Sequence, residues 1–227
     1  TAPPDYLAYD FGKERPEFIG GHGALTVEWA DIGTLSYDPN ESVVKGKVGF
    51  GVIPGSKQVF DARTGEWVDF PDVNYAPYAA FGGWVASVTK TTKNPECAFD
   101  YATFMGSKNI SMELNVLPAS GVNPSRYSHL DNIDPWVEAG FPDAANAKAY
   151  LDAIKTGYNN PNYVADWRIP GGNDYFTSME AHLARALAKE ISPQQAMSDM
   201  ADEWNEITDR LGRDKQLQYL KDSLGIQ

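Results

Sequence analysis

The chain has 227 residues, of which 42% are hydrophobic and 22% are charged, and its formal net charge is −12. This excess of acidic side chains disfavours nucleic acid and anionic membrane surfaces as partners, because there is no surplus of cations to neutralise phosphate groups. The length suffices for one or two domains with a buried core, the 6 Trp, 12 Tyr and 10 Phe argue against intrinsic disorder, and no apolar run is long enough to span a membrane.

The N-terminal residues do not look like the start of a domain. Residues 1–6 are rich in proline and lack the basic and apolar regions of a signal peptide. We therefore expect any signal peptide to lie outside this chain, and we expect Thr1 to be a cut point in a longer protein.

The first 75 residues or so are predicted to form strands and loops. Residues 24–29 alternate in polarity as a short strand does, and in residues 47–53 the apolar side chains share one face. Residues 61–67 predict a turn between two short strands, and residues 84–88 predict a further apolar strand.

The rest of the chain is predicted to be mainly helical. Asn94 followed by Pro95 is typical of a helix start, and Ser192 opens a capping box with proline just inside the helix. Further helices are expected over residues 143–158, 176–187 and 214–224. The helix after Ser192 carries an apolar stripe at steps of three and four, formed by Met197, Met200, Trp204, Ile207 and Leu211. Strands mixed with longer helices indicate an α/β or α+β class.

Catalytic and metal-binding motifs are not supported. His22, His129 and His182 lie far apart in sequence, and none pairs with the single cysteine, Cys97, at metal spacing. Phosphate-loop, dinucleotide and nucleophile-elbow motifs are absent. We expect no cofactor, and we interpret Cys97 as a buried structural residue. With one cysteine no intrachain disulfide can form, which fits the cytosol and equally the bacterial periplasm.

Three tryptophans lie at the ends of predicted elements, where clefts are lined. Trp29 ends a predicted strand, Trp84 follows a Gly-Gly pair, and Trp167 lies in a loop before a helix. An indole face stacks on the apolar face of a sugar ring, and neighbouring polar side chains such as Asp31 and Arg168 bind its hydroxyls. Trp136 and Trp204 are instead expected in the core.

Several segments, in order along nearly the whole chain, resemble one bacterial family. They are FIGGHGALTVEWADIG (18–33), KGKVGFGVIP (45–54), FGGWVASVTKTTKNPECAFDYATFM (81–105), the stretch 117–126 that ends in P-x-R, and residues 174–211 with S-P-x-x-A at their centre. By these segments the chain resembles the C-terminal part of the extracellular solute-binding proteins, family 1, of bacterial ABC importers. That family includes maltose-binding and other sugar receptors.

The resemblance implies an α/β, periplasmic-binding-protein-like fold of two lobes that close on a solute. Residues 1–77 are then a segment of the C-terminal lobe, residues 78–120 cross into the N-terminal lobe, and residues 121–227 supply C-terminal-lobe helices. Such a receptor is not an enzyme. It works in the periplasm, or anchored outside a Gram-positive cell, and delivers a sugar or related solute to a permease in the inner membrane. The expected ligand-binding residues are Trp29, Asp31, Gly82, Gly83, Trp84, Arg126, Trp167 and Arg168.

The family's opening strands and helices are absent from this sequence, so we expect a fragment whose site is incomplete. Residues 78–120 then leave an unpaired strand edge, which a strand-exchanged dimer could cover. Two other functions stay open: a carbohydrate-active enzyme domain that uses paired carboxylates, and an interaction module whose aromatic side chains all lie in the core. The interaction module predicts that no small solute raises the melting temperature, whereas a specific ligand must raise it.

Overall fold

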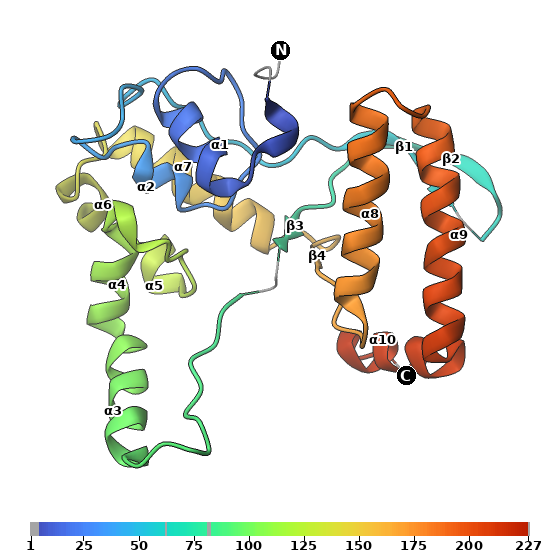
Figure 1. Cartoon of the computed structure of the whole chain (residues 1–227). Coiled ribbons are helices and arrows are strands. Elements are labelled where there is room, and N and C mark those ends of the chain that lie inside the picture. The colour runs from blue at the N-terminus through green and yellow to red at the C-terminus, as the bar shows by residue number, and fades with distance from the viewer. Residues whose placement is uncertain (1–4, 62, 81–82, 227) are drawn as a thin grey trace. The chain divides into compact units, whose positions relative to one another are not determined.

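The computed structural model describes residues 5–61, 63–80 and 83–226. The chain forms two compact units, one of Asp10–Ala165 and one of Thr1–Tyr9 with Asp166–Gln227. The structure is mixed α/β, with helices and two small two-stranded sheets in its described parts (Figure 1). No helix in those ranges is long and apolar enough to cross a membrane.

The larger unit is built from short helices, with strands in two places. Its helices are α1 (Phe11–Ile19), α2 (Ile32–Leu35), α3 (Pro95–Met105), α4 (Lys108–Val116), the 3-10 helix η3 (Pro118–Ser120), α5 (Tyr127–Leu130), α6 (Asp134–Glu138) and α7 (Ala144–Tyr158). Its strands are β1 (Ser56–Asp61), β2 (Glu66–Asn74), β3 (Tyr78–Ala79) and β4 (Val164–Ala165). Strands β1 and β2 form an antiparallel hairpin, and β3 pairs with β4 in parallel.

The core of this unit is a cluster of aromatic and aliphatic side chains around α7. Its buried members are Tyr37, Leu130, Trp136, Phe141, Ala147, Tyr150 and Leu151. The rings of Trp136 and Tyr150 meet edge to face with centroids 5.2 Å apart, the arrangement that aromatic quadrupoles favour. The Trp136 indole N–H donates to the carbonyl of His129 at 2.9 Å, so burial leaves no unsatisfied donor there. The prediction of Trp136 as a core residue is confirmed.

The strand predictions are confirmed only in part. The turn over residues 61–67 does join two strands, β1 and β2. Residues 24–29, 47–53 and 84–88 are not strands in the structure, so these three predictions are wrong. In residues 47–53 the alternating polarity does match the burial of the side chains. Phe50 is half-buried, and its ring centroid lies 5.1 Å from that of Tyr150. Alternating polarity indicates which face of a segment is buried, but a strand also needs backbone hydrogen bonds to a neighbouring strand.

The smaller unit is helical in its described residues, apart from its loops. It contains the 3-10 helix η1 (Tyr6–Ala8), α8 (Gly172–Leu187), α9 (Pro193–Leu211) and α10 (Arg213–Leu224). Helices α8 and α9 pack side by side, and α10 contacts α9 (Figure 1). The Trp204 indole N–H donates to the Tyr175 carbonyl at 3.0 Å and so links the two long helices.

The helix predictions are confirmed, with two corrections at single residues. Met200 and Ile207 of the α9 stripe are buried, but Met197, near the start of the helix, is 55% exposed. Cys97 lies on α3, which has no buried residue, and its side chain is exposed, so the interpretation of Cys97 as a buried residue is wrong. Both corrections have one cause: periodicity identifies an apolar face, but not whether another element covers it.

Candidate functional site

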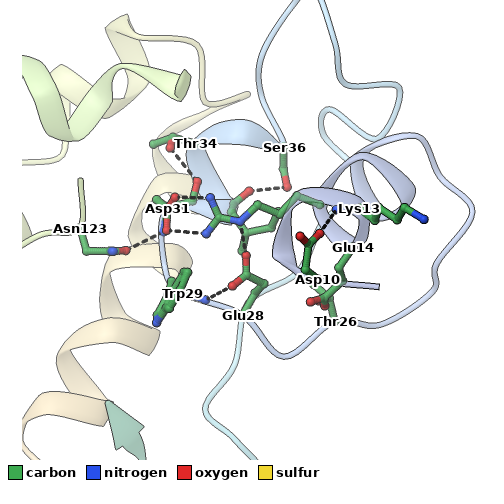
Figure 2. A network of polar contacts seen from close by, with 12 residues as sticks. Asp10, Lys13, Glu14, Thr26, Glu28, Trp29, Asp31, Thr34, Ser36 and Asn123 are labelled. Carbon is green, nitrogen blue, oxygen red and sulfur yellow. Dashed lines mark hydrogen bonds and ion pairs between the residues drawn. The ribbon is translucent and has the colours of Figure 1, made fainter. Parts of the chain in front are cut away.

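An ion-pair network joins α1 to the segment that carries two of the expected ligand-binding residues (Figure 2). The Arg15 guanidinium donates to Asp31 through both terminal nitrogens, at 2.7 Å from Nη1 to Oδ2 and 3.1 Å from Nη2 to Oδ1. Its Nε donates to Glu28. Burial lowers the pKa of Arg15, but the hydrogen bonds with Asp31 and Glu28 outweigh that effect, so the pKa lies above its usual value. The guanidinium is therefore held as a cation between two carboxylates.

Asp31 is almost fully buried and holds three segments together. Its backbone N–H donates to the Asn123 side-chain oxygen at 2.7 Å, and its backbone carbonyl accepts from the Thr34 hydroxyl at 2.8 Å (Figure 2). The side chain of Asp31 is only 2% exposed. Both carboxylate oxygens of Asp31, an expected ligand-binding residue, thus accept hydrogen bonds from Arg15 and help to hold these segments together.

Trp29 stands at the edge of the same network. It is half-buried, and the Arg15 guanidinium carbon lies 5.5 Å from the centre of its ring, within range of a cation–π interaction. Its backbone N–H donates to Glu28 Oε1 at 3.0 Å (Figure 2). A half-buried indole on a fixed base suits stacking with a flat apolar ligand face, because little side-chain freedom is lost on binding.

Close packing fixes the helix that follows Asp31. A Cβ added to Gly33 of α2 would lie 2.4 Å from Cε2 of the Tyr150 ring, so only glycine fits there without a shift. The Tyr150 hydroxyl is buried, and among the described residues it has no hydrogen-bond partner. Burial, with the Asp31 carboxylate nearby, raises the pKa of Tyr150. Tyr150 is thus neutral, and its ring packs closely against the start of the helix that follows Asp31.

Arg126, another expected ligand-binding residue, lines a cleft of about 250 Å³ in the larger unit. The cleft combines two tyrosines with cationic, amide and hydroxyl groups, and its lining residues are Ser125, Arg126, Tyr127, Leu130, Lys155, Tyr158 and Asn159. The guanidinium of Arg126 donates to the Gly106 carbonyl at 2.6 Å, and Tyr127 is 73% exposed. Aromatic faces beside fixed hydrogen-bonding groups are the surroundings that polar, ring-shaped ligands need.

The α7 side of this cleft is held by two side-chain contacts. The Lys155 ammonium donates to Asp131 Oδ1 at 2.5 Å, and the Tyr158 hydroxyl donates to the Pro124 carbonyl at 3.2 Å. Burial raises the pKa of Tyr158, so its hydroxyl stays protonated at neutral pH and keeps its donor.

A buried histidine, His129, supports the side of the cleft that Ser125 forms. His129 has no exposed surface, its Nδ1 accepts from the Ser125 backbone N–H at 3.3 Å, and its Nε2 lies 3.1 Å from the Ser111 hydroxyl. We assign the proton to Nε2, because Nδ1 acts as an acceptor. Burial, and then the charge of Arg126, lowers the pKa of His129. The neutral ring therefore ties the cleft wall at Ser125 to α4.

The remaining expected site residues lie elsewhere. Gly83, at φ +105°, and Trp84, 82% exposed, belong to the segment without helix or strand before α3, whereas Gly82 lies outside the described residues. Trp167 and Arg168 belong to the smaller unit, where Trp167 meets Trp204 edge to face at 4.8 Å. The structure thus brings Trp29 and Asp31 together around Arg15, and places Arg126 in the cleft.

The smaller unit has a groove of its own between α8 and α9, with a volume of about 460 Å³. At its wall the Ser178 hydroxyl donates to Glu203 at 2.8 Å, and His182 Nε2 lies 2.9 Å from the same carboxylate. These contacts with Ser178 and His182 lower the pKa of Glu203. The serine bonds to the carboxylate rather than to the imidazole, so this trio lacks the serine–base contact of an activated nucleophile.

Sequence reasoning missed Arg15, Asn123, Lys155 and Tyr158. Arg15 and Asn123 are far from Asp31 in sequence, and no periodicity connects them. Lys155 and Tyr158 do carry a signal, since a step of three places them on one face of a predicted helix. Among the described residues, no group of His, Cys, Asp or Glu side chains could hold a metal ion.

No known family model matches this chain, and no solved structure matches it. The ordered family-like segments, the Arg15–Asp31 network and the cleft at Arg126 are therefore the features that bear on function.

Proposed function

We propose that the chain is the substrate-binding component, or part of one, of a bacterial ABC importer, and that it binds a sugar or related polar solute for delivery to a permease. In this proposal the protein works in the periplasm or anchored outside a Gram-positive cell, and it is not an enzyme. The fold is proposed to be that of the periplasmic binding proteins. The support is the series of family-like segments, which runs in order along nearly the whole chain.

One structural observation carries the proposal further than the sequence does. Arg126 ends the family-like segment 117–126, and it lines a cleft beside Tyr127 and Tyr158. The cleft offers two aromatic faces, a guanidinium and an amide within about 250 Å³. This volume lies just under the usual range for small-molecule sites, so it suits a solute of monosaccharide size.

The direct test is isothermal titration of the chain with a panel of neutral and charged sugars. All residues that line the cleft at Arg126 belong to this chain, so we expect at least one sugar to bind there even though the family's opening segments are absent. We expect Arg126→Ala and Tyr127→Ala each to weaken its affinity by about tenfold, as removal of an anchoring side chain does. Arg63→Ala is the matched control, because Arg63 is an exposed arginine of the β1–β2 turn, away from the cleft. Circular dichroism would show that each variant is folded.

Two outcomes would contradict the proposal. If no sugar in the panel binds or raises the melting temperature, an interaction module becomes the better explanation. If a sugar binds but is also converted to product, the chain is an enzyme. Unchanged affinity in both cleft variants would instead leave the receptor function standing and move the site to Trp29 and Trp84, where alanine substitutions should then weaken binding.

A further inference from the structure

Helix α3 carries large apolar side chains that the described structure leaves uncovered. Phe99 is 61% exposed, Tyr101 is 65% exposed and Phe104 is 55% exposed, and no residue of the helix is buried. At 100° per residue, Phe99 and Tyr101 point to nearly opposite sides of the helix. A helix that is apolar on several sides belongs in an interior, so more than one surface is needed to cover α3.

The segment before α3 also exposes large apolar side chains. Trp84 is 82% exposed and Val85 is 90% exposed. Residues 85–88 form neither a helix nor a strand, and among the described residues no backbone hydrogen bond joins them to another segment. Backbone N–H and C=O groups without partners can pair with those of a second strand.

The exposed area is large enough to hold two chains together. An aromatic side chain buries about 150–250 Å² when it is covered, so the exposed parts of Trp84, Phe99, Tyr101 and Phe104 amount to about 500 Å² per chain. Two copies would together bury about 1,000 Å², which is the lower limit for a specific interface. Val85 and the backbone pairing add to this.

The charges of this region favour a second copy of the same chain. The chain has a net charge of −12, yet residues 83–105 carry two lysines and two acidic residues and are neutral overall. Lys90 and Lys93 precede the helix, whereas Glu96 and Asp100 lie on it. A twofold axis that runs two copies antiparallel therefore places the lysines of one copy near the acidic residues of the other.

We propose that residues 83–105 are a self-association surface: residues 85–88 of two copies pair as strands, and the α3 helix of each copy packs against the new strand and the helix of the other. This arrangement covers opposite sides of α3, which contact with a single flat face would not do. The partner is a second copy of this chain, and the symmetry is twofold.

Sedimentation equilibrium of the 227-residue chain tests the proposal, and Cys97 provides a second readout. We expect a dimer at micromolar concentration, and we expect the double variant Phe99→Ser/Phe104→Ser to weaken it by about a hundredfold. Tyr219→Ser is the control, because Tyr219 is a comparably exposed aromatic residue on α10. Cys97 is exposed on α3, so a maleimide should label it more slowly in the dimer than in the double variant.

Because the substituted side chains are exposed, the double variant is expected to fold, and circular dichroism checks this. Loss of the dimer in the double variant alone, with faster Cys97 labelling, supports the proposal. A chain that stays monomeric over the concentration range overturns it. A dimer that persists in the double variant also overturns it, since the contact must then lie elsewhere.

Discussion

The Arg15–Asp31 pair is a residue-scale feature whose role can be separated from ligand binding. A buried carboxylate that accepts two hydrogen bonds from a guanidinium is costly to remove, because the remaining charge keeps its burial and loses its partner. Arg15 retains some contact with solvent, since its side chain is 15% exposed, and this moderates the cost.

We expect Asp31→Asn to lower the free energy of unfolding by about 3 kcal/mol, the low end for breaking a buried pair. Urea denaturation measures this. Asp152→Asn is the control, because it breaks the exposed Lys148–Asp152 pair on α7 and should change little. An equally small effect of both substitutions would mean that Asp31 is available to a ligand after all.

His129 gives a prediction about pH. Its folded pKa lies below the ordinary value of 6.5, so near and below that pH the unfolded chain binds more protons than the folded one. The contribution of the neutral ring to stability is therefore complete above about pH 6.5 and is lost as the pH falls. We expect the melting temperature to fall between pH 7.5 and pH 5, and we expect His129→Gln to flatten that slope.

His22→Gln provides the control for this prediction, because it removes a histidine that is 69% exposed and leaves His129 in place. An NMR titration of the His129 ring needs no variant and gives its pKa directly. A midpoint at or above 6.5 in the folded chain would refute the role given to the buried ring.

At the scale of elements, the cap of α9 is the clearest local determinant. The Ser192 hydroxyl accepts from the Gln195 backbone N–H at 3.1 Å, as the sequence predicted for a capping box. The Gln195 side-chain nitrogen donates to Asp199, and among the described residues no bond from the Ser192 backbone N–H to Gln195 completes the box. The side-chain half of the cap at this helix start is thus supplied by Ser192.

We expect Ser192→Ala to destabilise the chain by about 1 kcal/mol, the usual cost of losing a capping side chain. Asn94→Ala at the start of α3 is the matched control, because the Asn94 side chain makes no capping hydrogen bond and should matter less. Thermal unfolding followed by circular dichroism compares the two. A larger loss in the Asn94 variant would show that the cap geometry does not govern these helices.

Helices were predictable from the sequence because their causes are local. Proline in the first turn, the Ser192 cap and apolar steps of three and four act within one or two turns, and α3, α7, α8 and α9 follow from such signals. The predicted strands failed where pairing depended on distant backbone, as in residues 47–53. The predictions of burial failed for the same reason. Met197 and Cys97 lie on correctly predicted helices, but nothing in the described structure covers the sides of those helices that carry them.

At the scale of the whole molecule, the candidate site was predictable only in its local parts. Trp29 and Asp31 are neighbours in sequence, and Arg126 stands next to Tyr127, so local patterns could single them out. The contact of Arg15 with Asp31, and the place of Lys155 and Tyr158 in the cleft beside Arg126, join residues that are far apart in sequence. Spacing puts Lys155 and Tyr158 on one face of a helix, but it does not show that this face meets Arg126.

The net charge of −12 leads to a last prediction about the proposed dimer. Two copies repel each other as whole molecules, and salt screens that repulsion over about 10 Å at 0.1 M ionic strength. Salt also weakens any pairing of Lys90 and Lys93 with acidic residues of the second copy, but exposed ion pairs contribute little. The general repulsion therefore outweighs the local attraction, and we expect the dissociation constant to fall several-fold as salt is raised. Sedimentation equilibrium at increasing sodium chloride measures it, with the Phe99→Ser/Phe104→Ser variant as reference. A dimer that weakens with salt would mean that ion pairs, not the apolar surface of α3, hold it together.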